Sequence, residues 1–103
     1  MFRRQRFGDV IARQLELFRR EQADLFLEID AAEAKYDRAD RAEAEELYGD
    51  YQDLVETGTE ILADLRDHFK WSLGEQAAEQ YEAEFNNAVR KEFPRFALEI
   101  ENR

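Results

Sequence analysis

Residues 11–36, IARQLELFRREQADLFLEIDAAEAKY, contain the apolar pattern that decides the fold. Steps of four and three residues along this stretch reach Ile11, Leu15, Phe18, Gln22, Leu25, Ile29, Ala32 and Tyr36, which are apolar at every position except Gln22. This spacing is typical of an amphipathic helix with one buried face. Because neither Gly nor Pro interrupts the stretch, it predicts one continuous helix of roughly 26 residues, a rod about 40 Å long.

A second helix is expected after a turn at residues 37–41, where no large apolar side chain occurs. Asp40 and Glu43 have the spacing of a capping box, so this helix should begin near Arg41. Its apolar row comprises Leu47, Tyr51, Leu54, Gly58, Ile61, Leu65 and Phe69, with Tyr48, Val55 and Leu62 beside it. Two long helices joined by a short turn lie antiparallel and pack along each other.

A third helix and a short fourth helical segment follow. Ser72 and Glu75 form a second possible capping box, so the third helix should start there. Its inner face comprises Tyr81, Phe85, Ala88, Val89 and Phe93. Pro94 lacks an amide proton and should end this helix, and it suits the first position of a short helix that carries Phe96 and Ile100.

The expected fold class is all-α. The three apolar helices should form an elongated antiparallel three-helix bundle with a short C-terminal helical segment. A chain of 103 residues is long enough for one modest core and too short for two, so residues 1–103 should form a single domain.

The composition describes an acidic protein with a basic start. The chain has a formal net charge of −10, and 13% of its residues are aromatic, which favours a packed core over disorder. Residues 1–20 hold six arginines and two acids, whereas residues 21–89 hold 20 acids and five bases. An acidic body argues against nucleic acid as a partner, because affinity for that polyanion comes mainly from neutralised phosphates.

The sequence also indicates a setting for the protein. It contains no cysteine, which excludes disulfides and thiolate metal ligands and favours a reducing, cytoplasmic location. No apolar run approaches membrane-spanning length, so no integral membrane segment is expected. The predominance of arginine over lysine suggests a GC-rich bacterial genome.

The basic N-terminal arm, residues 1–8 (MFRRQRFG), allows two interpretations. It is expected to be a flexible terminus that moves over the acidic body. The alternative is a contact with a phosphate or a membrane surface through Arg3, Arg4 and Arg6, with Phe2 and Phe7 as apolar anchors.

Five side chains are candidates for chemistry: Glu43, Glu46, Asp50, Asp64 and His68. His68 is the only histidine, and Asp64 precedes it by one helical turn, a spacing that suits a carboxylate-oriented base or part of a metal site. A pair on the surface of a helix near its C-terminal end explains the same spacing without chemistry.

The remaining acids define an alternative function. Glu46, Gly49 and Asp50 loosely resemble one motif of the MazG-type all-α phosphohydrolases, with a spacing that departs from that of the family by one residue. The resemblance implies a magnesium-dependent nucleotide hydrolase that binds its metal through carboxylates on facing helices. Acids are so frequent in this chain that solvated helix faces are the leading interpretation, and no metal or other cofactor is expected.

Gln22 and Gly58 interrupt the apolar rows and indicate close packing. If the first turn is centred near Ala39, antiparallel pairing places Gly58 between Phe18 and Gln22, so that a large side chain can sit over the glycine. Gln22 would then fix the register of the two helices. The alternative is a small pocket over Gly58, with Gln22 and Thr57 or Thr59 as polar anchors.

Surplus apolar side chains predict an interface. They are Val10, Leu17, Phe93, Phe96, Leu98 and Ile100. An exposed apolar patch usually marks a partner surface, and twofold pairing is the commonest assembly of small proteins. The leading functional hypothesis is therefore a non-enzymatic interaction or assembly protein that forms a homodimer, with another protein as the alternative partner. In a competing account, Phe96 and Ile100 pack back against Tyr36, Leu47 and Tyr48 within one chain.

Overall fold

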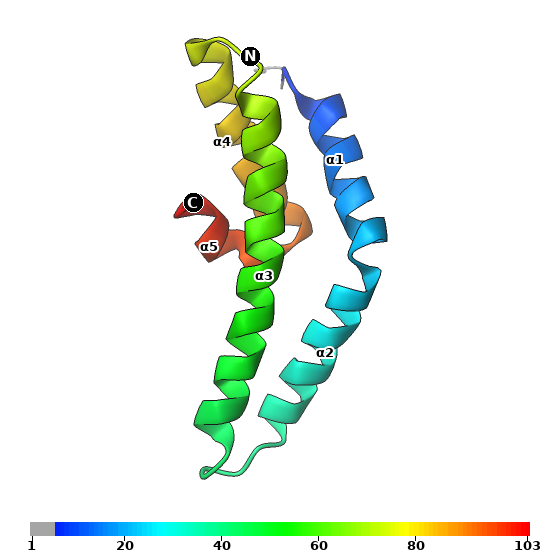
Figure 1. Cartoon of the computed structure of the whole chain (residues 1–103), viewed down its shortest axis with the longest axis vertical. Coiled ribbons are helices and arrows are strands. Elements are labelled where there is room, and N and C mark those ends of the chain that lie inside the picture. Colours follow the sequence, from blue (N-terminus) through cyan, green and yellow to red (C-terminus); the bar gives the residue numbers. More distant parts are fainter. Residues whose placement is uncertain (1–5) are drawn as a thin grey trace.

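The computed structural model describes residues 6–103 and is all-helical, with 84% helix (Figure 1). Its elements are α1 (Gly8–Glu21), α2 (Ala23–Asp37), α3 (Ala44–Lys70), α4 (Glu75–Glu92), the 3-10 helix η1 (Pro94–Phe96) and α5 (Ala97–Glu101). No strand occurs in the described part of the chain, which confirms the all-α prediction. The molecule is elongated, with extents of 50 × 28 × 24 Å, and α3 runs along its length.

The expected continuous rod over residues 11–36 is wrong, because it bends at Gln22 and forms two helices. Gln22 has backbone angles of φ −107° and ψ 25°. The amides of Gln22 and Phe26 still donate to carbonyls four residues earlier, at 2.9 and 3.0 Å, so these two hydrogen bonds are kept at the bend. In Figure 1 the junction of α1 and α2 is the part of this arm that lies furthest from α3.

Four phenylalanine rings fill the inside of the bend. They belong to Phe18, Phe26, Phe93 and Phe96, and their centroids lie between 5.4 and 6.3 Å apart. Around them α1 packs against α4, whereas α2 packs against α3. A straight rod could not make both contacts around four close-packed rings, so tertiary packing bends a stretch that contains neither Gly nor Pro.

The central helix is α3, which contacts α2, α4, η1 and α5. Its buried residues are Val55, Gly58, Thr59, Leu62, Ala63 and Arg66. The row predicted to face the core is only half-buried at Tyr51, Leu54, Ile61, Leu65 and Phe69. The true inner face is therefore rotated toward Val55 and Leu62, because α4 and the C-terminal segment cover that side of the helix.

The helix ends agree with the predicted boundaries only in part. The carboxylate of Asp40 accepts a hydrogen bond from the amide of Glu43 at 3.0 Å, as the first capping box requires, but α3 begins only at Ala44. The second capping box is wrong, because the Ser72 hydroxyl donates to the carbonyl of Phe69 at 2.6 Å and closes α3 instead. Pro94 stands at the start of η1, as expected.

Candidate interaction surface

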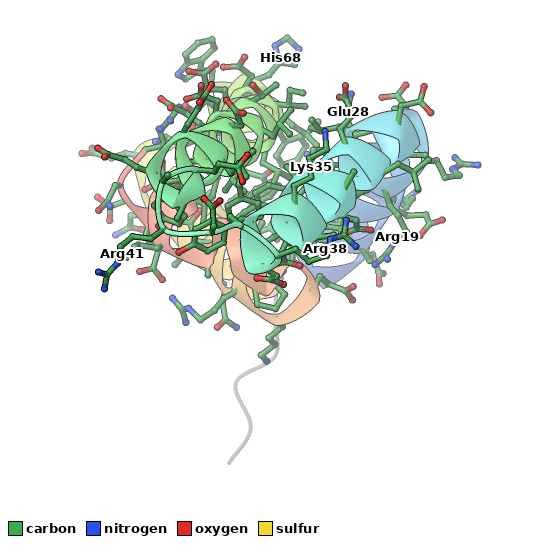
Figure 2. The ribbon with its side chains drawn as sticks, turned by 90° about the horizontal axis from the view of Figure 1, so that it is seen from below. Arg19, Glu28, Lys35, Arg38, Arg41 and His68 are labelled. Carbon is green, nitrogen blue, oxygen red and sulfur yellow. The ribbon has the colours of Figure 1, made fainter. Side chains whose placement is uncertain are left out.

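The structure does not bring the candidates for chemistry together. Glu43, Glu46, Asp50, Asp64 and His68 are all exposed along α3 and the turn before it. Within residues 6–103, no group of three His, Cys, Asp or Glu side chains could hold a metal ion. Figure 2 shows His68 at the periphery of the molecule, projecting away from the helices.

Gly58 lies under the ring of Phe96, not under Phe18. A Cβ atom at Gly58 would stand 2.7 Å from Cε1 and 2.8 Å from Cζ of Phe96, and 3.4 Å from Cδ2 of Leu25. The start of α3 at Ala44 lengthens the turn and moves Gly58 along the partner helix to Leu25, past Gln22. The ring also fills the space of the proposed pocket, and Gln22, half-buried at the bend, does not stand over the glycine.

Three of the predicted interface residues belong to the core of the single chain. Phe93, Phe96 and Ile100 are 4%, 0% and 0% exposed, so assigning them to an interface is wrong. After α4 ends, η1 and α5 turn back onto α3 and α4, which buries these side chains near the middle of α3. The competing account expected Phe96 and Ile100 to pack against Tyr36 and Leu47 at the hairpin end, and this expectation is also wrong. Leu17 and Leu98 remain exposed, and Val10 is half-buried.

A buried arginine, Arg66, anchors the C-terminal segment, and the sequence did not reveal it. Its side chain is 1% exposed. Nε donates to Asp67 at 2.9 Å, and Nη1 donates to Asn86 at 3.0 Å and to the carbonyl of Ile100 at 3.2 Å. Among residues 6–103, Nη2 has no hydrogen-bond partner. One guanidinium therefore ties α3, α4 and α5 together.

Ion pairs at the surface also hold the C-terminal segment. Arg103 lies 3.5 Å from both Glu56 and Glu60 on α3, and Arg90 pairs with Glu101. These contacts are exposed and each contributes little, but together with Arg66 they keep the last residues docked.

The beginning of α1 is packed as well. The ring of Phe7 meets Phe69 and Tyr81 at centroid distances of 6.4 and 5.4 Å, and Glu84 accepts hydrogen bonds from the amides of residues 6 and 7. Phe7 is thus half-buried in the protein and is not free as an anchor. The predicted contacts of Phe2, Arg3 and Arg4 lie outside the described residues.

Tyr81 joins α4 to α1 inside this cluster. Its hydroxyl donates to Oε1 of Gln14 at 2.8 Å. Burial raises the pKa of Tyr81 to about 12. The phenol is therefore a neutral structural group.

A hollow of about 220 Å³ lies between α1 and α4. Ile11, Leu15 and Ala88 give it an apolar floor, and its rim includes Glu16 and Arg19. Arg19 reaches Glu92 across this rim at 2.9 Å, so an ion pair bridges the opening. The hollow therefore resembles a seam between helices more than an open ligand site.

The exposed large apolar side chains lie in four places. Tyr36 and Tyr48 contact each other at the hairpin end, with ring centroids 5.2 Å apart. Trp71 and Leu98, which are 78% and 76% exposed, each stand alone on other elements. Leu17 and Leu27, which are 41% and 67% exposed, lie on either side of the bend at Gln22.

We name the surface that carries these two leucines the outer face of the α1–α2 arm. Its members, all exposed, are Arg13, Leu17, Arg20, Asp24, Leu27 and Ala31. Their spacing of four and three residues places them on one side of the arm. The buried row of Ile11, Leu15, Phe18, Leu25 and Ile29 occupies the opposite side.

None of the helices described in the structure is both long enough and apolar enough to cross a membrane. Comparisons of the chain with protein-family models, curated proteins and solved structures found no match.

Proposed function

We propose that this protein is a non-enzymatic assembly module that forms a homodimer through the outer face of the α1–α2 arm. Its scaffold is an elongated antiparallel bundle of three rods, namely the bent arm, α3 and α4. The single observation that supports the proposal is that Leu17 and Leu27 are exposed together on one side of the arm, on either side of the bend.

The size of the exposed area sets the expected strength. In a twofold dimer each copy contributes Leu17 and Leu27, so four leucine side chains become buried. At 25 cal/mol per Å² of buried apolar area, this burial stabilises the complex by on the order of 5–9 kcal/mol. The loss of rotational and translational freedom offsets several kcal/mol of that gain. A dissociation constant near 1 μM corresponds to about −8 kcal/mol, so the other contacts of the outer face must add to those of the leucines for a dimer to form at micromolar concentration.

The alternative of a magnesium-dependent nucleotide hydrolase gains no support from the positions of its carboxylates. Glu46 and Asp50 are exposed one turn apart near the start of α3, and Asp64 is exposed far from them near its end. Within residues 6–103 they form no group of three possible metal ligands. If these side chains bound magnesium, millimolar metal would raise the melting temperature and nucleotide would be turned over. The assembly hypothesis expects neither effect.

Light scattering tests the proposal directly. We expect twice the 12.3 kDa chain mass at micromolar concentration. Leu17→Glu places a charge in the contact and should give the monomeric mass, with helix content unchanged in circular dichroism. Leu98→Glu is the matched control, because Leu98 is more exposed and lies on α5, and it should remain dimeric. A monomeric mass for the unmodified protein throughout this range would contradict the proposal.

A further inference from the structure

We propose that two copies of the chain cross antiparallel at the bend, with a twofold axis beside Gln22. In this arrangement Leu17 of one copy contacts Leu27 of the partner subunit, and Arg20 pairs with Asp24 of the partner subunit. This inference rests on the proposed function and adds to it the partner, the orientation and the register of the interface.

The spacing of the outer face around Gln22 carries the argument. Leu17 lies five residues before Gln22 and Leu27 five after it, whereas Arg20 lies two before and Asp24 two after. An antiparallel twofold pairing brings together positions at equal distances on either side of the axis, and it does so twice. The outer face therefore matches itself, leucine on leucine and arginine on aspartate.

The charges of the outer face are available for this pairing. Neighbouring Arg19 is already paired with Glu16 and Glu92. By contrast, neither Arg20 nor Asp24 forms an ion pair with any residue from 6 to 103. Complementary charges at a contact fix its register more than its strength.

The shape of the arm places the same residues foremost. The junction of α1 and α2 is the part of the arm that lies furthest from α3 (Figure 1). The helical spacing of the outer face places it on the side of the arm opposite the buried row. Two convex arms that meet there touch first around Gln22 and diverge toward their ends. At the next turn on either side, Arg13 faces the small side chain of Ala31 of the partner subunit, which leaves room for its long stem.

Other registers lose this match. A slip of one helical turn sets Leu17 of one copy against Ala23 or Ala31 of the partner subunit, depending on its direction, and separates Arg20 from Asp24. A parallel arrangement brings Arg20 of the two copies together, and like charges at a contact are unfavourable. Only the antiparallel register centred at Gln22 pairs both leucines and both charges.

Thiol cross-linking tests the register, because the chain contains no cysteine of its own. Leu17→Cys and Leu27→Cys are purified separately and treated with a short bismaleimide, alone and as a mixture. We expect a cross-linked dimer only in the mixture. In either variant alone, the two thiols of a dimer would be separated along the arm by about 15 Å, ten residues of helix.

Charge exchange provides a second, independent readout. Arg20→Asp should weaken dimerisation about tenfold, since it creates two like-charge contacts per dimer, and Asp24→Arg should do the same. The double variant Arg20→Asp/Asp24→Arg should regain the dissociation constant of the unmodified protein within about threefold, because the swapped charges pair again. Arg20 and Asp24 are both exposed, so the substitutions should not disturb the fold, which circular dichroism of each variant checks.

The outcomes separate the two proposals. A dimer that shows no cross-linking in the mixture, equal cross-linking in the separate variants or no recovery in the double charge variant would overturn this arrangement and leave the homodimer standing. An unmodified protein that is monomeric would overturn both.

Discussion

Replacing Gly58 by alanine tests the packing of the C-terminal segment against α3. Alanine is the better helix former, so the change alone should stabilise α3 by about 1 kcal/mol. The new Cβ, however, would lie 2.7 and 2.8 Å from two atoms of the Phe96 ring, well inside van der Waals contact. Phe96 is 0% exposed and is held by Phe18, Phe26 and Phe93, so the ring cannot move aside cheaply.

Overpacking of this kind costs about 1–3 kcal/mol, which exceeds the gain in helix propensity. After the gain of about 1 kcal/mol in helix propensity is subtracted, we expect Gly58→Ala to lower the free energy of unfolding by up to about 2 kcal/mol in urea denaturation. Gly49 provides the matched control in the same helix, because nothing lies within 4 Å of its Cβ position. Gly49→Ala should stabilise the protein by up to about 1 kcal/mol.

A double-mutant cycle assigns the cost to the ring. In a Phe96→Leu background the overlap is relieved, and Gly58→Ala should then be neutral or stabilising. Equal stabilisation by Gly58→Ala and Gly49→Ala in the otherwise unmodified protein would show that the Phe96 ring does not pack on Gly58.

Three further predictions concern charged and titrating groups. Burial raises the pKa of Tyr81 from 10.0 to about 12, so with rising pH the phenol ionises in the unfolded state before it ionises in the folded state. The protonated phenol therefore contributes fully to the free energy of unfolding below pH 10, and this contribution is lost as the pH rises from 10 to about 12. Tyr81→Phe should remove this part of the alkaline slope in chemical denaturation. Arg66→Met should destabilise the fold by about 1–3 kcal/mol and speed amide exchange in α5, since the carbonyl of Ile100 loses its donor. The protein has a net charge of −10, so added salt should screen the repulsion between its acidic side chains and raise the melting temperature from low to moderate salt. A melting temperature that does not change with salt would count against such net repulsion.

The helices could be predicted from the sequence because their apolar spacing is local. Ile11, Leu15, Phe18, Leu25 and Ile29 are buried as the first pattern indicated. On α4, Tyr81, Phe85 and Val89 are fully buried in the same way. Such rows specify which side of a helix is inside before any partner is known.

The bend at Gln22 could not be predicted, because its cause lies about 70 residues away along the chain. The rings of Phe93 and Phe96 reach the inside of the arm only after α4 has ended and the chain has turned back. The same return explains why three apolar residues assigned to an interface are core residues.

The inner face of α3 was misjudged because two of its buried residues are polar. The Thr59 hydroxyl donates a hydrogen bond to the carbonyl of Val55 at 2.8 Å. The guanidinium of Arg66 donates to Asp67 and to the carbonyl of Ile100 in the C-terminal segment. Both continue the row of Val55 and Leu62 at helical spacing, which is the signal that could have revealed them.

In the proposed dimer, the two copies meet at the outer face of the α1–α2 arm. A dilution series by NMR, with backbone amides assigned, measures this contact most directly on a chain of 12.3 kDa. We expect the amide shifts that change with concentration to cluster at residues 13–31, with little change in α4 and α5. Shifts that do not respond to dilution, or that respond around Trp71 or Leu98 instead, would contradict the proposed contact.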